Sequence, residues 1–305
     1  MHATVLLATF NGGSFLDEQI ASLAAQDVDR LDVHVGDDGS TDATLALLAR
    51  WASRWRKGRF VVERGPGTGF AENFRSLVAA ELPEPSDGVA FCDQDDIWGP
   101  DKLTVALRAL AAYGSRPAVY ASRSQLIDAA GRPIGYTRAP RRPPSFGNAL
   151  VESIASGNTM VLNPAAHRLI AASARRTGFL YHDWWTYLLV SGAGGVLHHD
   201  PASHIRYRQH GGNQLGSNRR LAARLKRLRG QFGGDLRRWN DANLTSLAAV
   251  RDLLTPSAQQ LLDELCDIRQ HRGPMAVRRL AASGIRRQTW RGNASLALAA
   301  WLGRL

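Results

Sequence analysis

Extended apolar runs alternate with helix-like segments along the first 120 residues, and this order constrains the fold more than any other feature. The extended runs lie at residues 3–8, 31–36, 59–63 and 88–92. The segments between them, with apolar residues at roughly helical spacing, lie at 14–25, 42–55 and 70–80. Such an order is typical of a mostly parallel sheet covered by helices on both faces. The sequence therefore predicts an α/β fold in which a central sheet is flanked by helices.

The pattern loosens beyond residue 120. We expect a strand at 118–121, a hairpin over 125–136, a strand at 159–162, helices at 164–175 and 183–190, and short strands at 195–199 and 204–207. From about residue 218 onward only basic, Leu- and Ala-rich helical segments follow. The chain is therefore expected to divide into an α/β domain over 1–215 and a basic helical extension over 216–305.

The positive charge of the chain belongs to its C-terminal third. Residues 201–305 hold 19 Lys and Arg against 6 Asp and Glu, whereas residues 1–200 hold 19 against 21. Within this third, 219–229 and 278–291 combine basic residues with apolar residues at helical spacing. Basic amphipathic helices bind anionic membrane surfaces, and they also pack an apolar stripe on a neighbouring domain. Both readings stay open on the sequence alone.

Neither the cysteines nor the N-terminus indicates export. Cys92 and Cys266 lie far apart and form no metal or redox motif. No basic region precedes the first apolar run, and no apolar run reaches the ~20 residues that span a bilayer. We therefore expect a cytoplasmic protein, with peripheral binding to the inner face of the cytoplasmic membrane if the basic helices face lipid.

Three carboxylates, Asp93, Asp95 and Asp96, follow the run at 88–92 directly. Ligands of open α/β sheets bind just outside the carboxyl ends of the strands. Clustered carboxylates there repel one another unless a cation lies between them, and Mg²⁺ or Mn²⁺ prefers oxygen ligands. The alternative is a solvated loop that leads into a helix near Pro100.

A second polar loop, from Gly36 to Asp42, follows the run at 31–36. An acidic residue at such a strand end can hydrogen-bond a ribose or a base. Ser40, Thr41 and Asp42 could instead cap the next helix. Capping requires only one side chain, so Asp37 and Asp38 are candidates for ligand binding.

Four motifs carry a resemblance to a known family. They read V-L-L-A-T-F-N-G, V-G-D-D-G-S-T-D, G-F-A-E-N-F and F-C-D-Q-D-D-I-W-G-P-D-K-L, and they occur in family order within residues 3–215. The chain resembles family 2 inverting glycosyltransferases with the GT-A (Rossmann-like) fold, and among them the bacterial branch labelled rhamnosyltransferase-like.

The resemblance implies roles for particular residues. The expected nucleotide-binding residues are Thr9, Asn11, Asp37, Asp38 and Asp93. Asp95 is the expected direct ligand of Mg²⁺ or Mn²⁺, with Asp93 beside it and His210 completing the metal site or touching the diphosphate.

The same resemblance implies that Asp183, in the pair His182-Asp183, is the base. A positioned carboxylate can take the proton of an acceptor hydroxyl, and a single displacement with one base inverts the anomeric centre. The alternative role of Asp183 is a helix N-cap. Trp184 and Trp185 would stack on sugars or pack in the core, and Arg206 and Arg208, at alternate positions of a strand, would contact the acceptor or the diphosphate.

The expected activity is metal-assisted transfer of a sugar, for which the branch suggests rhamnose, from a nucleotide donor to a surface polysaccharide or lipid-linked glycan. A sugar nucleotidyltransferase is the alternative enzyme, although Thr9–Gly13 lacks the basic residues that such a loop usually has. A nucleic-acid-binding protein is the alternative outside enzymes. We expect no nucleic acid partner, because the basic residues do not interleave with aromatic residues as a stacking platform requires.

Overall fold

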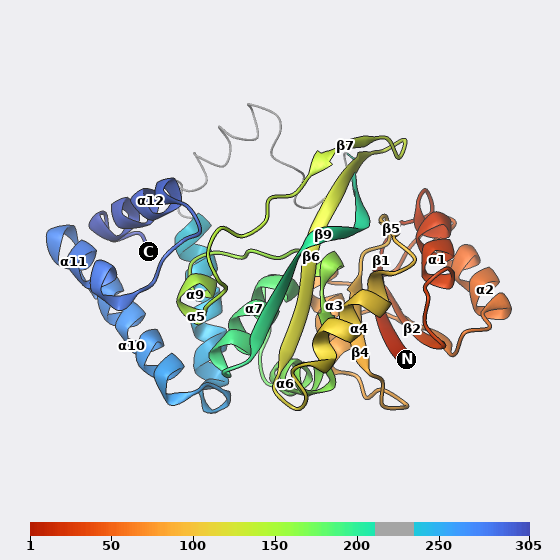
Figure 1. Ribbon diagram of the computed structural model, residues 1–305, viewed down its shortest axis with the longest axis horizontal. Helices are drawn as coiled ribbons and strands as arrows, with labels where there is room; N and C mark the ends of the chain where they lie inside the picture. The colour runs from red at the N-terminus through yellow and green to blue at the C-terminus, as the bar shows by residue number, and fades with distance from the viewer. Residues whose placement is uncertain (211–234) are drawn as a thin grey trace.

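The computed structural model describes residues 1–210 and 235–305, and it confirms the alternation of strand and helix at the N-terminus (Figure 1). The elements of this first part are β1 (His2–Thr9), α1 (Leu16–Ala24), β2 (Arg30–Asp37), α2 (Thr44–Arg54), β3 (Phe60–Arg64), α3 (Phe70–Ala79) and β4 (Gly88–Cys92).

The middle of the chain adds shorter strands and further helices. These elements are β5 (Ile97–Trp98), α4 (Lys102–Ala111), β6 (Ala118–Asp128), β7 (Pro133–Tyr136), α5 (Phe146–Ala149), η1 (Gly157–Thr159), β8 (Val161–Leu162), α6 (Pro164–Ala174), α7 (His182–Gly192) and β9 (Val196–Gln209). The predicted hairpin is confirmed, since β6 and β7 pair antiparallel. The two short strands expected at 195–199 and 204–207 are one long strand, β9, whose pairing with β6 shifts register on the way.

The strands of the described residues form one mixed sheet in the order β3-β2-β1-β4-β8-β6-β9-β5, with β7 added beside β6. The pairs of β1 with β2 and β4, and of β2 with β3, are parallel. Beyond β4 the short strand β8 is antiparallel to both of its neighbours. The pair of β6 with β9 is parallel again, whereas β5 with β9 and β7 with β6 are antiparallel. The sheet is therefore mixed: the expected parallel arrangement holds among β1, β2, β3 and β4 and between β6 and β9, and the remaining pairs are antiparallel.

The sheet separates two hydrophobic cores. On β1, Val5 and Leu7 face one core and Leu6 faces the other, because successive side chains of a strand point to opposite faces. The first core contains apolar side chains of α1, α2 and α4. The second contains those of α3, α5, α6 and α7 together with side chains from the C-terminal helices.

The C-terminal helices lie at the opposite end of the molecule from α1 and α2 (Figure 1). They are α9 (Asp235–Ala249), α10 (Pro256–Gln270), α11 (Gly273–Ser283) and α12 (Trp290–Trp301), with a short turn, η2 (Arg251–Leu253). No helix within residues 1–210 and 235–305 is long and apolar enough to cross a membrane.

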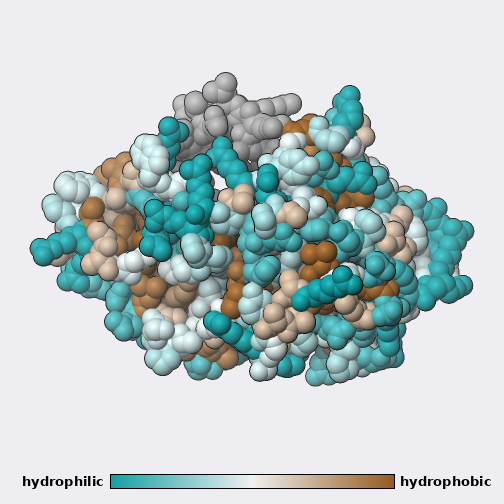
Figure 2. All heavy atoms as spheres, in the orientation of Figure 1, coloured by the Kyte–Doolittle hydropathy of each residue, from teal (hydrophilic) through white to brown (hydrophobic). Residues whose placement is uncertain are grey.

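Of the two basic segments singled out in the sequence, 219–229 lies outside the described residues. In 278–291, Leu280 and Ile285 are buried in the second core, so this part of the segment packs on the rest of the protein. Trp290 is 70% exposed, and exposed apolar side chains continue along α12. Figure 2 shows hydrophobic residues on the surface at this end of the molecule.

Candidate active site

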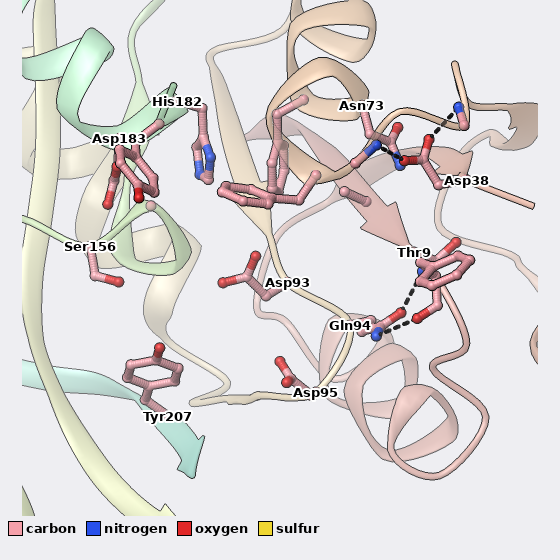
Figure 3. Close-up of a pocket in the computed structure, with 18 residues that line it drawn as sticks. Thr9, Asp38, Asn73, Asp93, Gln94, Asp95, Ser156, His182, Asp183 and Tyr207 are labelled. Atoms are coloured by element: carbon pink, nitrogen blue, oxygen red, sulfur yellow. Dashed lines mark hydrogen bonds between the residues drawn. The ribbon is translucent and has the colours of Figure 1, made fainter. Parts of the chain in front are cut away.

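A cavity of about 510 Å³ opens at the carboxyl ends of β1, β2 and β4. The parallel register that pairs Thr9 with Asp37 and Leu7 with Cys92 aligns these strand ends. Figure 3 shows polar side chains that approach the cavity from several elements, namely Thr9, Asp38, Asn73, Asp93, Gln94, Asp95, Ser156, His182, Asp183 and Tyr207. Five of the predicted site residues therefore line one cavity: Thr9, Asp38, Asp93, Asp95 and Asp183.

Asp37 stabilises the loop that follows β2 by accepting hydrogen bonds within the protein. Its Oδ1 accepts hydrogen bonds from Thr9 Oγ1 at 2.9 Å and Ser40 Oγ at 2.6 Å. Its Oδ2 accepts from the backbone N–H groups of Gly39 and Ser40 at 3.1 and 2.9 Å. The side chain is buried and does not line the cavity. Asp37 thus shapes the loop that presents Asp38, a role that differs from the expected contact with a nucleotide.

Asp38 does face the cavity, and it anchors the glycine-rich loop after β3. Its two carboxylate oxygens accept from Gly67 N at 3.1 Å and Gly69 N at 2.9 Å. Both glycines have positive φ, 72° and 106°, which other residues rarely adopt. This explains the glycines of the loop without any phosphate-binding motif.

Side chains near the start of α2 and in the loop after β1 also form hydrogen bonds within the protein. Asp42 Oδ1 accepts from Thr44 N at 3.0 Å, so Asp42, one of the three candidates for capping, supports the start of the helix. Asn11 Oδ1 accepts from Thr41 N at 2.9 Å, and Asn11 lies outside the cavity lining. The amide of Gln94 pairs with both backbone groups of Phe10, which ties the β4 loop to the β1 loop.

The carboxylates that follow β4 divide into two groups. Asp93 and Asp95 line the cavity, whereas Asp96 is fully buried and accepts from Asn158 Nδ2 and from Arg208 N. Burial, followed by repulsion from Asp95 and Asp183, raises the pKa of Asp93 to about 7. Asp95 Oδ2 lies 2.7 Å from Nε2 of His210, which brings together the two residues expected at a metal site.

Arg208 supports this loop from behind. Its side chain is 3% exposed, donates from Nε to the Asp95 carbonyl at 3.0 Å and forms an ion pair with Glu18. The guanidinium also lies over the Phe15 ring, 4.7 Å from its centroid. Arg206 is exposed and does not line the cavity. The expectation that both arginines contact substrate is therefore not met. Arg206 lies outside the cavity lining, and the guanidinium of Arg208 bonds to other residues of the protein.

Asp183 lies in the first turn of α7, across the cavity from the β4 loop (Figure 3). Its Oδ1 accepts from Trp184 N at 2.6 Å, and the carboxylate also receives the backbone N–H of Gly157. Burial outweighs these hydrogen bonds and raises the pKa of Asp183 to about 6. A carboxylate with this pKa is ionised at neutral pH and can accept a proton.

Trp184 and Trp185 lie in the core, and neither lines the cavity. Trp184 Nε1 donates to the Ala149 carbonyl at 2.7 Å, and Trp185 Nε1 donates to Ser173 Oγ at 3.0 Å. Helix α7 is buried on nearly all sides, as expected of a helix that is apolar all round. Trp184 and Trp185 therefore pack in the core, and the expected stacking on sugars is not found.

Several residues of the cavity were not predicted from the sequence. Asn73 and Gln94 stand inside the quoted motifs, and the lining also includes Ser156, Gly157, Tyr181 and Tyr207. The last four come from irregular segments or from a strand end, and no spacing pattern marks them. Asn73 Nδ2 donates to the Gly36 carbonyl at 2.8 Å, which fastens α3 to the end of β2.

The donor set at this site fits a hard divalent cation in part. Within residues 1–210 and 235–305, no three His, Cys, Asp or Glu side chains form a ready set of metal ligands. Asp95 and His210 nevertheless lie together, and the charges of Asp95 and Asp183 add to the effect of burial in raising the pKa of Asp93. Mg²⁺ is commonly held by one or two carboxylates together with substrate phosphates, so two or three protein ligands suffice.

Known proteins resemble this chain in sequence. The model of Glycosyl transferase family 2 matches residues 4–147. The dTDP-rhamnosyl transferase RfbG of Shigella flexneri is 27% identical over 239 residues, which are 73% of this chain and 78% of that protein. The succinoglycan biosynthesis protein ExoW of Rhizobium meliloti is 35% identical over 98 residues, which are 32% of this chain and 30% of that protein.

Solved structures share the fold. Residues 1–349 of S. aureus TarS in complex with UDP-GlcNAc align with a TM-score of 0.58 at 15% identity, over 86% of this chain and 70% of that chain. The mannosyltransferase PcManGT from Pyrobaculum calidifontis, in complex with GDP-Man and Mn²⁺, aligns with a TM-score of 0.54 at 18% identity, over 99% and 76%. The protein is therefore a glycosyltransferase that carries a family 2 domain on a GT-A fold.

Proposed function

We propose that the protein moves a sugar from a nucleoside-diphosphate donor to a hydroxyl of a surface polysaccharide or a lipid-linked glycan, with inversion of the anomeric centre. The observation that carries this proposal is the placement of Asp183 opposite Asp93 and Asp95 in one cavity. A donor sugar bound between them would have its leaving group beside the β4 loop and the acceptor beside α7. Similarity to RfbG supports rhamnose from a dTDP donor as the first sugar to test.

In the proposed reaction Asp183 is the base. Its carboxylate is held at the start of α7 by the N–H groups of Trp184 and Gly157, which fixes the direction of its free lone pairs. It accepts the proton of the acceptor hydroxyl as that oxygen attacks the anomeric carbon. Because no second nucleophile is required, one displacement takes place and the configuration inverts.

Thr9 and Asp38, at the ends of β1 and β2, are proposed to bind the nucleoside. Asp95, with Asp93 and His210, would hold Mg²⁺ or Mn²⁺ together with the diphosphate oxygens. A bound cation neutralises the charge that develops on a diphosphate leaving group. The Mn²⁺ complex of the structural neighbour PcManGT supports trying Mn²⁺ first.

A panel of nucleoside-diphosphate sugars tests the proposal directly. Thermal shift and hydrolysis are measured for UDP-, dTDP- and GDP-sugars, with and without Mn²⁺. We expect at least one donor to stabilise the protein and to be hydrolysed slowly without an acceptor. If no donor binds or reacts under any metal condition, the proposed function is wrong.

We expect kcat/KM of transfer to fall as the pH drops below about 6. The folded-state pKa of Asp183 lies near 6, so at lower pH the carboxyl is protonated and cannot accept the acceptor's proton. The measurement is kcat/KM across both sides of this pH, with the protein confirmed to be folded throughout. The residual activity of Asp183→Asn should lack this inflection. An identical acidic limb in the variant would contradict the assignment.

The exposed apolar side chains of α12 are proposed to bind the protein to the cytoplasmic face of a membrane. This α12 patch comprises Trp290, Leu298, Trp301 and Leu302. Exposed arginines flank it, namely Arg286, Arg291 and Arg304. Apolar side chains beside basic ones suit the interface of an anionic bilayer, where a lipid-linked acceptor would lie.

Replacing Trp301 with Ser is expected to weaken binding to anionic vesicles by about tenfold, because burial of a large apolar side chain contributes about 1.5–3 kcal/mol. Co-sedimentation with vesicles of anionic and of neutral lipid measures this. Leu45→Ser is the matched control, since Leu45 is equally exposed, at 49%, on α2 at the other end of the molecule. Binding that does not depend on anionic lipid would contradict the membrane proposal.

A further inference from the structure

His182 is a buried polar side chain in the cavity that the proposed chemistry does not use. It is only 7% exposed, and it lines the cavity beside Asp183. Neither Nδ1 nor Nε2 has a hydrogen-bond partner in the described part of the chain. Figure 3 shows the imidazole directed toward the space between Asp183 and Asp93.

The surroundings of His182 do not by themselves call for a polar side chain. The imidazole packs against Phe74 in a tilted arrangement with ring centroids 3.9 Å apart, and it meets Phe91 edge-on at 4.8 Å. A phenylalanine would make the same kind of aromatic contacts. A buried polar group without a partner costs about 1–3 kcal/mol, so the free protein would be more stable with an apolar ring here. Such a group in a native structure calls for an explanation, and a bound ligand provides one.

Gly157 makes room for the imidazole. A Cβ on Gly157 would lie 2.0 Å from His182 Nε2, so any other residue would displace the ring. The backbone N–H of the same glycine bonds to Asp183. The turn at Gly157 therefore positions both the proposed base and the neighbouring imidazole.

The chemistry of His182 suits a hydroxyl group. Burial lowers the pKa of His182 to about 3, so the ring is neutral at physiological pH. A neutral imidazole has one N–H donor and one acceptor nitrogen, and a hydroxyl can serve as the partner of either. A diphosphate, which only accepts and carries negative charge, would be better matched by a cation.

We propose that His182 is a specificity-determining residue that hydrogen-bonds a hydroxyl of the transferred sugar. A hydroxyl of the donor sugar is the expected partner, because the imidazole is directed toward the space between Asp93, proposed to serve the diphosphate, and Asp183, proposed to serve the acceptor. The inference rests on the proposed function, and it adds the group that distinguishes one donor sugar from another.

The test uses His182→Phe, which retains an aromatic ring against Phe74 and Phe91 and removes both nitrogens. With the best donor of the panel, we expect kcat/KM to fall about 10- to 100-fold, the equivalent of 1–3 kcal/mol. Binding of the nucleoside diphosphate alone should not change, and the melting temperature without ligand should be equal or higher. Singly deoxygenated donors identify the hydroxyl: the wild type should discriminate against one of them about 10- to 100-fold, and His182→Phe should not.

Two further variants make the outcome decisive. His182→Asn, which retains a donor and an acceptor, should recover part of the discrimination, and it takes the place of His182→Phe if that variant does not fold. His167→Phe is the matched control, because Nε2 of His167 also lacks a partner but lies on α6 outside the cavity. It should leave kcat/KM and donor discrimination unchanged.

The outcomes separate the inference from the proposed function. If the wild type uses a donor and His182→Phe discriminates among deoxygenated donors just as the wild type does, the inference is overturned and the proposed function stands. An equal loss of affinity for the nucleoside diphosphate alone also overturns it. If the wild type accepts no nucleotide sugar at all, the proposed function itself has failed.

Discussion

Asp183→Asn is expected to lower kcat by about 10²–10⁴-fold, the usual contribution of a general base, while donor binding stays near normal. An asparagine keeps a side-chain oxygen for the N–H of Trp184, which Asp183 now accepts at 2.6 Å, so the start of α7 should be preserved. What is lost is the ability to take a proton. The measurement is release of nucleoside diphosphate in the presence of an acceptor, alongside donor binding by calorimetry.

Asp183→Asn should also affect the stability of the folded protein. Burial raises the pKa of Asp183 from 3.8 to about 6, so the ionised side chain is disfavoured in the folded protein relative to the unfolded chain. Above that pH the charge therefore destabilises the fold, and its removal should not lower the melting temperature. Asp252→Asn, which removes an exposed partner of Arg176, is the control for a general loss of Asp. Normal turnover in Asp183→Asn would show that the base lies elsewhere.

Asp95→Ala is expected to lower transfer by about 10³-fold and to remove the dependence of nucleotide binding on Mn²⁺. A divalent cation contributes several kcal/mol to stabilising the charge of a leaving group, and each 1.36 kcal/mol corresponds to about tenfold in rate. Asp95 is the carboxylate that faces both the cavity and His210. Titration of nucleoside diphosphate with and without Mn²⁺ checks the binding effect, and steady-state transfer checks the rate.

Two comparisons make this second result specific. Asp101→Ala, at an exposed aspartate just before α4, should behave as the wild type. Asp183→Asn should lose transfer but keep the Mn²⁺ dependence of binding, because Asp183 is proposed to act on the acceptor. If Asp95→Ala retains full Mn²⁺-dependent binding, Asp95 is not the ligand.

The sequence was sufficient to predict which elements meet at the site. Alternating strands and helices put the ends of β1, β2 and β4 at one edge, and this brought Thr9, Asp38, Asp93 and Asp95 to one cavity. That Asp183 would join them followed from the family resemblance, since 87 residues of irregular pattern lie between Asp95 and Asp183. Local periodicity contains no information about such a distance.

The direction of individual side chains was the part that the sequence could not supply. Asp37 and Asp38 are adjacent on the chain, yet the first bonds into its own loop and the second faces the cavity. Arg206 and Arg208 are alternate residues of one strand, and only Arg208 meets the loop after β4 and Glu18. The contacts of Arg208 come from segments distant in sequence, whereas Asp37 bonds mainly to Gly39 and Ser40 of its own loop. The sequence also left two alternatives for Trp184 and Trp185. The apolar run along α7 favoured burial in the core, whereas their aromatic rings suggested stacking on sugars.

The contact between Trp184 and Trp239 has a consequence for how relatives of this protein diverge. The two rings meet edge-on with centroids 6.1 Å apart, so the helix that holds the proposed base in its first turn packs against α9 of the C-terminal region. Apolar residues of α5, α7, α9 and α10 belong to the same core. A recombination event that exchanged everything after residue 215 would therefore also exchange the support of Asp183.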